Sequence, residues 1–216
     1  MNFLKVIIPS FNEIKSIRIL VPKLNKYKID YLIINDGSTD GTEKFLKNNI
    51  SSNNYINIFK NSGYDNAIFE GYKHAKTKKY KFIATFDSDL QHRIIDLVKL
   101  SKFTKDYDLI IGNRDRKNLL IEKIINKYFY KKYLISDILS GLKIYNIEKI
   151  NFHKPNKTKT AGMFFSLIAI SKNIKIKNYP IKINNRKFGK SKFGEFITGN
   201  FSLFHCFINT LVYLKK

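Results

Sequence analysis

Short apolar runs alternate with helix-length segments through the first half of this chain, and the alternation restricts its fold more than any other feature. Three of the runs are Val6-Ile7-Ile8, Tyr31-Leu32-Ile33-Ile34 and the stretch 81–86. Strands that alternate with helices indicate a mainly parallel sheet with helices on both faces. Such sheets bind ligands outside the carboxyl ends of their strands. We therefore expect an α/β protein with a site at one edge of its sheet.

The expected elements fill the chain without an evident linker or internal repeat. Strands are expected at 3–8, 30–35, 55–59, 80–86 and 107–112, near 142–146 and near 174–183. Helices are expected at 13–26, 41–49, 64–76, 93–104 and 118–134, and near 162–172. A length of 216 residues suffices for one domain with a substantial core. We assign 1–195 to this domain and 196–216 to a C-terminal helix.

Two carboxylates, Asp87 and Asp89, directly follow the expected strand 80–86. Like charges this close repel and raise each other's pKa. A hard divalent cation that takes carboxylate oxygens, and leaves positions for a diphosphate, removes the conflict. The alternative is a solvated turn, which Asp and Ser also favour. The cation site is favoured because the polar segments 9–13 and 35–42 follow two other strands and would meet it at the same edge.

In this order and spacing, the motifs resemble those of family 2 glycosyltransferases of the GT-A fold. Within that family they are similar to the polyprenyl-phosphate, or dolichol-phosphate mannose synthase-like, group. The resemblance covers roughly residues 3–195. The motifs that carry it are Pro9-Ser10-Phe11-Asn12-Glu13, Asn35-Asp36-Gly37-Ser38, Asn61-Ser62-Gly63, Asp87-Ser88-Asp89-Leu90-Gln91-His92, Gly112-Asn113-Arg114, Asp137 with Ser140-Gly141, and Arg186 with Gly189-Lys190-Ser191-Lys192.

The resemblance implies a nucleotide-sugar site in the first half of the chain. Asp89 would be the main ligand of Mg2+ or Mn2+, with Asp87 beside it on the ribose or the metal and Gln91 adding a neutral oxygen. Asp36 resembles the residue that hydrogen-bonds the base. Asn35 departs from the family pattern, because relatives often carry Asp there. The residues that would form the nucleotide-sugar pocket are Pro9, Phe11, Glu13, Asp36, Asp87 and Ser88.

The second half points to a phosphate acceptor. Arg suits bidentate phosphate recognition better than Lys, so Arg114 and Arg186 are the expected catalytic phosphate-binding residues. No acidic residue stands between Glu148 and Glu195, where many inverting transferases place a base that deprotonates an acceptor hydroxyl. A lipid phosphate is already anionic and needs no such base. Further expected contacts to the acceptor or its phosphate are Arg116, Ser140, Lys190, Ser191 and Lys192.

The chain carries a formal net charge of +23. This charge favours anionic partners, namely a nucleotide diphosphate, a lipid phosphate and a membrane surface, where each basic residue contributes ~1 kcal/mol. The lysines are dispersed, as an AT-rich genome would also produce. Nucleic-acid binding explains the charge but none of the acidic strand-end motifs, so no nucleic-acid partner is expected. The single Cys206 excludes an internal disulfide framework.

The C-terminal segment 196–216 is rich in Phe, Leu, Ile and Val and ends in two lysines. A bilayer span needs about 20 mostly apolar residues, so this segment is marginal for crossing. Apolar residues near helical spacing predict an amphipathic helix that lies in the membrane interface. The alternatives are a helix packed on the domain and a separate membrane-embedded partner. The chain begins in a strand without a signal-peptide pattern, which predicts that the protein faces the cytosol.

The sequence thus predicts a metal-dependent, inverting glycosyltransferase at the cytosolic face of the membrane. It would move a sugar from a GDP- or UDP-sugar donor to a polyprenyl phosphate such as dolichyl or undecaprenyl phosphate. The first alternative is transfer to a glycan hydroxyl in cell-surface polysaccharide or lipopolysaccharide synthesis. The second is a nucleotide-binding homologue without catalysis, because Lys143 stands where relatives commonly carry Arg.

Overall fold

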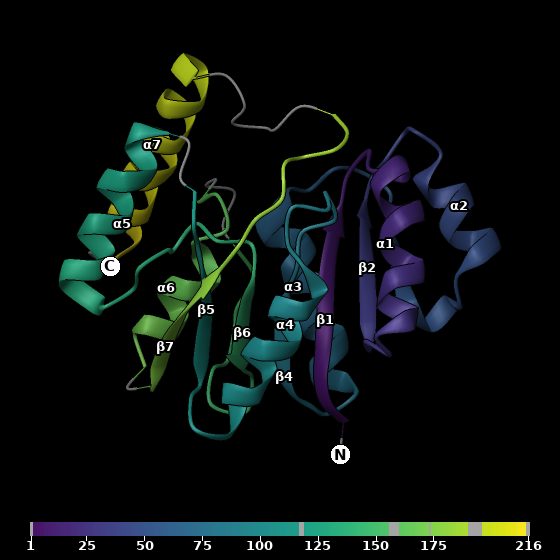
Figure 1. The fold of residues 1–216 in the computed structure, drawn as a ribbon, viewed down its shortest axis with the longest axis horizontal. Coiled ribbons are helices and arrows are strands. Elements are labelled where there is room, and N and C mark those ends of the chain that lie inside the picture. Colours follow the sequence, from purple (N-terminus) through teal and green to yellow (C-terminus); the bar gives the residue numbers. More distant parts are fainter. Residues whose placement is uncertain (1, 117–118, 156–159, 173, 190–195, 215–216) are drawn as a thin grey trace.

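One seven-stranded sheet forms the centre of the molecule in the computed structural model, which describes residues 2–116, 119–155, 160–172, 174–189 and 196–214 (Figure 1). The strand order is β3-β2-β1-β4-β6-β5-β7. Only β6 runs antiparallel to its neighbours, β4 and β5. The strands are β1 Asn2–Ser10, β2 Tyr31–Asp36, β3 Tyr55–Ile58, β4 Tyr80–Thr85, β5 Leu109–Arg114, β6 Lys143–Asn146 and β7 Ile176–Ile181.

Helices connect most of the strands and cover both faces of the sheet (Figure 1). The expected strands and helices are all present, with ends shifted by a few residues. The α-helices are α1 Ile14–Lys26, α2 Thr42–Asn49, α3 Tyr64–Thr77, α4 Ile94–Ser101, α5 Leu120–Tyr133, α6 Phe164–Ile170 and α7 Phe196–Leu214, and the two short 3-10 helices are Ser52–Asn54 and Lys102–Lys105.

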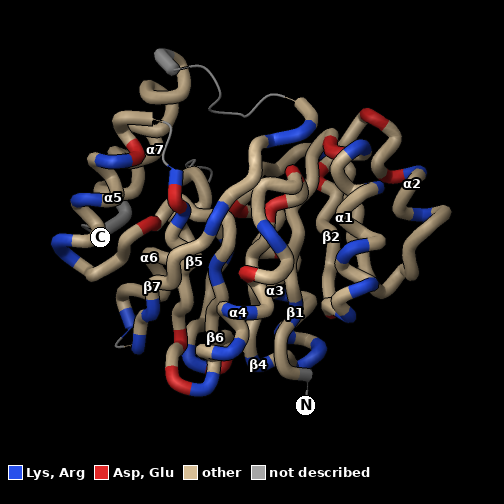
Figure 2. The backbone as a smooth tube through the Cα atoms, viewed as in Figure 1, with Lys and Arg blue, Asp and Glu red and all other residues tan. Residues whose placement is uncertain are grey.

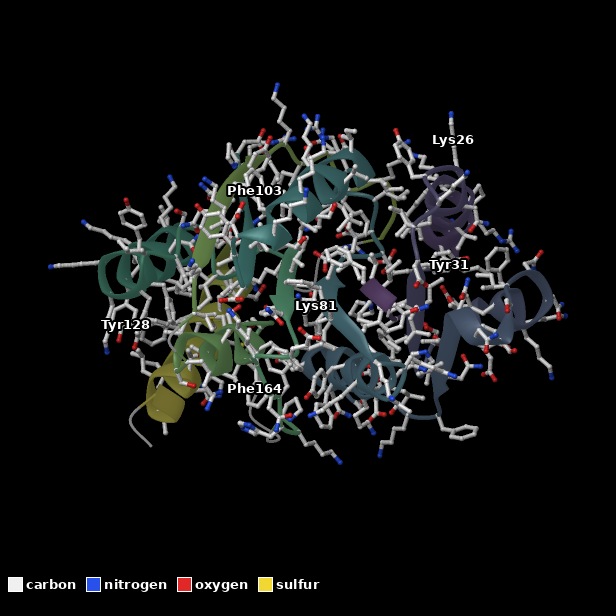
Figure 3. All side chains as sticks on the ribbon, turned by 90° about the horizontal axis from the view of Figure 1, so that it is seen from below. Lys26, Tyr31, Lys81, Phe103, Tyr128 and Phe164 are labelled. Carbon is white, nitrogen blue, oxygen red and sulfur yellow. The ribbon has the colours of Figure 1, made fainter. Side chains whose placement is uncertain are left out.

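The sheet separates two hydrophobic cores. Helices α3, α5, α6 and α7 contribute to the first core, and α1, α2 and α4 to the second. Successive side chains of a strand point to opposite faces, so Ile7 belongs to the first core while Val6 and Ile8 belong to the second. Seen from below the sheet, Phe164 and Phe103 lie on opposite sides of the strands (Figure 3). The apolar runs of the sequence therefore form strands that are buried on both faces.

Helix α7 packs along α5 at one side of the molecule (Figure 1). The ring of Phe207 lies 5.4 Å from that of Tyr128 and 6.3 Å from that of Phe129, measured between centroids. No helix among the described residues is long and apolar enough to cross a membrane. The outward side of α7 is nevertheless apolar as well, with exposed side chains at Phe201, Phe204, Ile208 and Val212.

Candidate active site

The loops that follow β1 and β2 are joined into one surface at the carboxyl edge of the sheet. The backbone N–H of Asn12 donates to Ser38 Oγ (2.9 Å), and that of Thr39 donates to Asn12 Oδ1 (2.8 Å). Asp40 Oδ2 accepts a hydrogen bond from the N–H of Ile14 at the start of α1 (3.0 Å). Asn12 has a φ of 56°, a left-handed conformation in which Asn is enriched. The two loops thus form a defined wall at the position expected for the nucleotide.

Asp36, at the end of β2, is buried and holds the segment that follows β3. Its Oδ1 accepts hydrogen bonds from the N–H of Ser62 (2.8 Å) and from Ser62 Oγ (2.7 Å), and its Oδ2 accepts one from the N–H of Gly63 (2.8 Å). Gly37 has a φ of 70°, and a Cβ there would lie 2.5 Å from the backbone nitrogen of Asn61. Asp36 therefore shapes this wall, and its direct hydrogen bond to a base stays a prediction.

Asp87 follows β4 and is fixed from three sides. Tyr64 Oη donates to its Oδ1 (3.3 Å), and His92 Nε2 lies 3.3 Å from its Oδ2. Burial alone would raise the pKa of Asp87, but its interactions with His92 and then with Tyr64 hold that pKa below the ordinary value. On the third side Gly141 leaves room for the carboxylate, since a Cβ there would lie 1.9 Å from Oδ2. Asp87 is thus an ionised carboxylate with one defined position.

The pKa of Asp89, two residues further on, is shifted in the opposite direction to that of Asp87. Burial, and then the charge of Asp87, raise its pKa to about 6. Its Oδ1 accepts a hydrogen bond from the N–H of Gln91 (3.0 Å), and its Oδ2 accepts one from Arg186 Nη1 (2.9 Å). Asp89 therefore loses its proton less readily than an ordinary aspartate, even with the guanidinium of Arg186 against it.

The residues around this pair fit a small divalent cation. Asp87 and Asp89 supply carboxylate oxygens, and the half-buried Gln91 supplies an amide. Within the described part of the chain, no cluster of three or more His, Cys, Asp and Glu residues could hold a metal alone. Mg2+ commonly binds through one or two carboxylates together with water and substrate phosphates. Such an ion would also remove the repulsion that raises the pKa of Asp89.

Residues 182–189, which we call the strap, run from β7 across the carboxyl edge of the sheet toward β1 (Figure 1). The N–H of Asn184 donates to the carbonyl of Gln91 (2.9 Å), and its side-chain amide donates to the carbonyl of Leu90 (3.4 Å). Arg186 binds Asp89 through Nη1 and Glu13 through Nη2. The strap therefore joins the loop after β4 to the loop after β1.

Arg116 also contacts the strap. Its Nη1 donates to Asn185 Oδ1 (2.9 Å), and its Nη2 donates to the carbonyl of Ile183. Two of the arginines that the sequence analysis selected, Arg116 and Arg186, thus meet on one segment. Three further residues expected near the acceptor, Lys190, Ser191 and Lys192, lie outside the described residues.

Arg114 lies in a buried ion-pair network instead. It binds the fully buried Asp137 through Nε (2.8 Å) and Nη2 (3.0 Å), and Nη2 also binds Glu122 on α5 (2.9 Å). Burial would lower the pKa of Arg114, but these two carboxylates raise it above the ordinary value. Ser140 is buried too, and its Oγ contacts the backbone of Leu142. These contacts favour a supporting role for Arg114 and Ser140 over direct contact with a phosphate.

Lys143 is a buried cation beneath the acidic loop. It pairs with Thr85 across β4 and β6, and its Nζ donates to the carbonyl of Gly162 (3.3 Å). Burial lowers the pKa of Lys143 to about 8, although the charges of Asp137, Asp65 and Asp87 act in the opposite direction. The sequence marks Lys143 only as a departure from the family pattern and does not mark Tyr64 at all, because both approach Asp87 only through the pairing of strands and helices.

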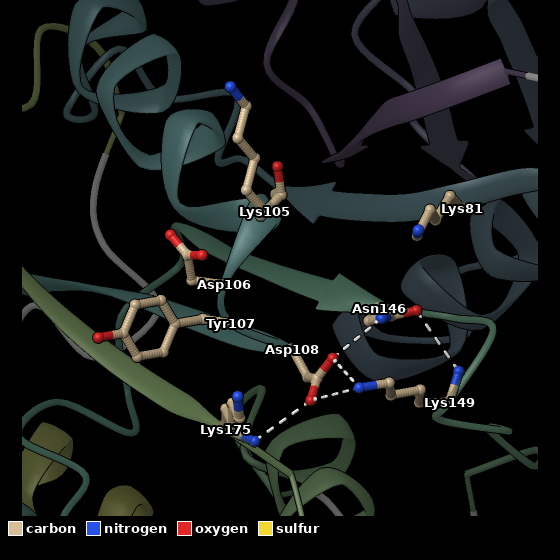
Figure 4. A pocket seen from close by; sticks show the side chains of 9 residues that line it. Lys81, Lys105, Asp106, Tyr107, Asp108, Asn146, Lys149 and Lys175 are labelled. Carbon is tan, nitrogen blue, oxygen red and sulfur yellow. Dashed lines mark hydrogen bonds and ion pairs between the residues drawn. The ribbon is translucent and has the colours of Figure 1, made fainter.

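Charged residues are distributed unevenly around the sheet. Figure 2 shows Lys and Arg over all parts of the chain, with several acidic residues grouped at the upper ends of the central strands. A cavity of about 240 Å³ lies at the opposite edge, and Lys81, Asp108, Lys149 and Lys175 are among the residues that line it (Figure 4). Asp108 accepts hydrogen bonds from Asn146 Nδ2 (3.0 Å) and from Lys149 Nζ (3.1 Å). Those contacts join strand ends and lie away from the acidic pair.

Comparisons with known proteins agree with this architecture. A family model described as Glycosyl transferase family 2 matches residues 5–175. Two uncharacterized proteins of Methanocaldococcus jannaschii, MJ0544 and MJ1222, are each 31% identical to this chain. The first alignment covers 79% of this chain and 83% of MJ0544, and the second covers 90% of this chain and 86% of MJ1222.

Among solved structures, the chain is similar to glucosyl-3-phosphoglycerate synthase from Mycobacterium tuberculosis. The match to that protein in complex with Mn2+, uridine diphosphate and phosphoglyceric acid has a TM-score of 0.71 at 12% identity, and covers 96% of this chain and 78% of that chain. The match to its structure described without ligands has a TM-score of 0.70 at 14% identity, with 96% and 80% covered. At these identities the likeness shows the fold, which is the GT-A fold.

Proposed function

This chain belongs to glycosyl transferase family 2, and on that premise we propose that it transfers a sugar from a nucleotide-sugar donor to a polyprenyl phosphate. It is a glycosyltransferase of the GT-A fold. The observation that carries the acceptor proposal is the position of Arg186, whose guanidinium lies against Asp89 on the strap, the segment that precedes α7 in the sequence. A guanidinium at this place suits a phosphate that attacks next to the donor diphosphate.

In the proposed reaction, an oxygen of the lipid phosphate attacks the anomeric carbon of the donor sugar. A carbon–oxygen bond forms there while the bond from that carbon to the diphosphate oxygen breaks, so the configuration inverts and the nucleoside diphosphate leaves. Mg2+ or Mn2+ bound at Asp87 and Asp89 would neutralise negative charge on the departing diphosphate. Arg186 and Arg116 would bind the acceptor phosphate by charge-assisted hydrogen bonds. The attacking oxygen is already ionised, so no carboxylate base is required.

The proposed donor pocket is the wall formed by the loops after β1 and β2. Pro9 and Asp36 would shape it from buried positions, and Phe11, which is 37% exposed, would offer its ring at the rim. Glu13 accepts a hydrogen bond from Ser16 Oγ (2.8 Å) at the start of α1 and would keep that loop in place. Ser88 is buried between the two acidic residues and would support their turn.

We further propose that the protein binds the cytosolic face of a membrane through α7. Four exposed apolar side chains on this helix, together with exposed Leu120 and Ile124 on α5, would be costly to leave in water and favourable to bury in an interface.

Phe201→Ser with Phe204→Ser should reduce co-sedimentation with vesicles that contain anionic lipid by at least about tenfold, since two aromatic side chains leave the interface. Phe59→Ser, at a fully exposed phenylalanine after β3, is the matched control. Equal binding by all three proteins would contradict the assignment.

A soluble phosphorylated acceptor is the second candidate. The similar structures from M. tuberculosis include complexes with phosphoglyceric acid, and a guanidinium binds a lipid phosphate and a free phosphate ester through the same contacts. The two acceptors differ in the apolar chain, for which the exposed apolar side chains of α7 would offer a surface.

An acceptor screen tests the proposal. The purified chain with Mn2+ is given UDP- and GDP-sugars, alone and with undecaprenyl phosphate, 3-phosphoglycerate or a glycan acceptor, while release of nucleoside diphosphate is measured. Release that requires undecaprenyl phosphate supports the proposal and identifies the donor. Release with 3-phosphoglycerate supports the second candidate, and release only with the glycan moves the reaction to a hydroxyl acceptor. Donor binding without release under any of these conditions would contradict all three.

A further inference from the structure

We propose that Arg186 is an internal counter-cation, which occupies the place of the divalent ion at Asp89 and is displaced when that ion binds. The inference rests on the proposed metal site. It concerns which group neutralises the charge of Asp89 when no metal ion is bound.

Each carboxylate oxygen of Asp89 is contacted by a different donor. Asp89 Oδ1 accepts the N–H of Gln91, a bond within the backbone turn, and Oδ2 accepts Arg186 Nη1 at 2.9 Å. Both carboxylate oxygens are therefore engaged by protein donors. Each carboxylate oxygen keeps a second lone pair, so these single bonds do not by themselves block a metal ion. The guanidinium at Oδ2 is positively charged, however, and repels a cation that approaches this carboxylate. Arg186 and the metal ion thus compete for the negative charge of Asp89.

The charges of the residues that contact Arg186 favour the same role. Arg186 bridges Asp89 and Glu13, and Asp87 stands two positions before Asp89 in the same loop. The side chain of Glu13, like that of Asp89, is 11% exposed, and that of Arg186 is 23% exposed. Carboxylates this poorly hydrated need a nearby cation. The guanidinium meets that need in the absence of metal, and a divalent ion would meet it more completely.

The backbone of the strap is anchored, so the side chain of Arg186 could move off Asp89 and still remain near the site. Asn184 stays bound to Leu90 and Gln91 by bonds that involve no charged group. Two residues further on, Arg186 is held by the ion pairs and by a bond from its Nε to the carbonyl of Phe188 (2.8 Å). Loss of the Asp89 contact would therefore free Nη1, while Glu13, Phe188 and the backbone of the strap keep Arg186 beside the site. The freed Nη1 would remain beside Asp89, near the place where the proposed metal ion and the phosphates of donor and acceptor would bind.

The test measures Mn2+ affinity of the full chain without nucleotide, by the electron paramagnetic resonance signal of free Mn2+. Arg186→Gln should bind Mn2+ on the order of tenfold more tightly than the wild type, because the competing cation is gone. Lys187→Gln removes the same charge from an exposed position of the strap and should stay within about twofold of the wild type. Equal or weaker binding by Arg186→Gln, with Asp89→Asn still abolishing binding, would overturn the inference and leave the metal site standing. Mn2+ binding that survives Asp89→Asn would overturn both.

A second measurement does not depend on the folding of Arg186→Gln. The chain contains five arginines, so the Nε–Hε signal of Arg186 can be resolved in a nitrogen–proton correlation spectrum and assigned by Arg186→Lys. Titration with diamagnetic Mg2+ should shift this signal with saturation, and Asp89→Asn should abolish the shift. An Arg186 signal that stays in place while Mg2+ saturates the protein would show that the guanidinium is not displaced.

Discussion

Gly141→Ala should displace one proposed metal ligand without unfolding the protein. The added Cβ would lie 1.9 Å from Asp87 Oδ2 and 2.3 Å from its Cγ, where an ordinary contact is at least 3.4 Å, so the carboxylate would have to retreat by about 1.5 Å. The obstructing atoms are the end of a side chain and not backbone, so rotation of Asp87 relieves the clash at little cost in stability. The same rotation breaks the contacts with Tyr64 and His92 that fix the carboxylate.

The expected loss in function is much larger than the loss in stability. A displacement of about 1 Å at a reacting centre costs roughly 100-fold, which corresponds to about 2.8 kcal/mol of binding or activation free energy. We expect Mn2+ affinity and the rate of nucleoside diphosphate release to fall by about that factor. The free energy of unfolding, measured with urea, should fall by less than about 1.5 kcal/mol.

The matched control is Ser140→Ala, which alters the same buried loop without placing an atom against Asp87. Its Mn2+ affinity should stay within about twofold of the wild type. Wild-type Mn2+ affinity in Gly141→Ala would refute the claim that the position of Asp87 matters. Loss of affinity together with a destabilisation above about 3 kcal/mol would refute the claim that only the side chain moves.

Two further predictions concern charge. Asp137→Asn breaks the buried pair with Arg114 and should lower the free energy of unfolding, measured with urea, by about 3 kcal/mol. Glu148→Gln removes an exposed pair with Lys81 at 3.7 Å and should lower it by less than about 0.5 kcal/mol. Similar losses in the two variants would contradict this prediction. Because the pKa of Asp89 is raised to about 6, Mn2+ affinity should fall below that pH and approach a tenfold loss per pH unit, and a flat profile between pH 5 and 8 would count against Asp89 as a ligand. In the metal-free protein the raised pKa means that the folded state holds this proton more tightly than the unfolded state, so its stabilising contribution is complete below about pH 4 and is lost as the pH rises through about 6.

The sequence predicts a candidate site at the carboxyl edge of the sheet. Apolar runs of strand length, followed each time by polar residues, predict parallel strands whose polar ends share an edge. The structure brings the segments after β1, β2 and β4 together in this way, and its elements match those expected to within a few residues. Asp87 and Asp89 stand out because two carboxylates after a buried strand are costly without a cation.

The individual contacts of the arginines could not be predicted in the same way. Arg114 and Arg186 look alike as candidates for phosphate binding, but Arg114 is held by Asp137, which lies 23 positions along the chain, and Arg186 reaches Glu13, which lies 173 positions away. Such partners depend on the order of strands in the sheet, and above all on the antiparallel β6 between β4 and β5. A local motif contains no information about that order.

The sequence by itself thus determined the class of fold, and it predicts the edge of the sheet that carries the proposed site and the acidic pair at its centre. These features follow from hydrophobic periodicity and from charge density along short stretches of chain, and both are local properties. Only the tertiary structure decided which arginine supports the fold and which one lies on Asp89. The reason is physical: the pKa of a carboxylate, and the freedom of a guanidinium, are set by neighbours that come together only when distant segments pack.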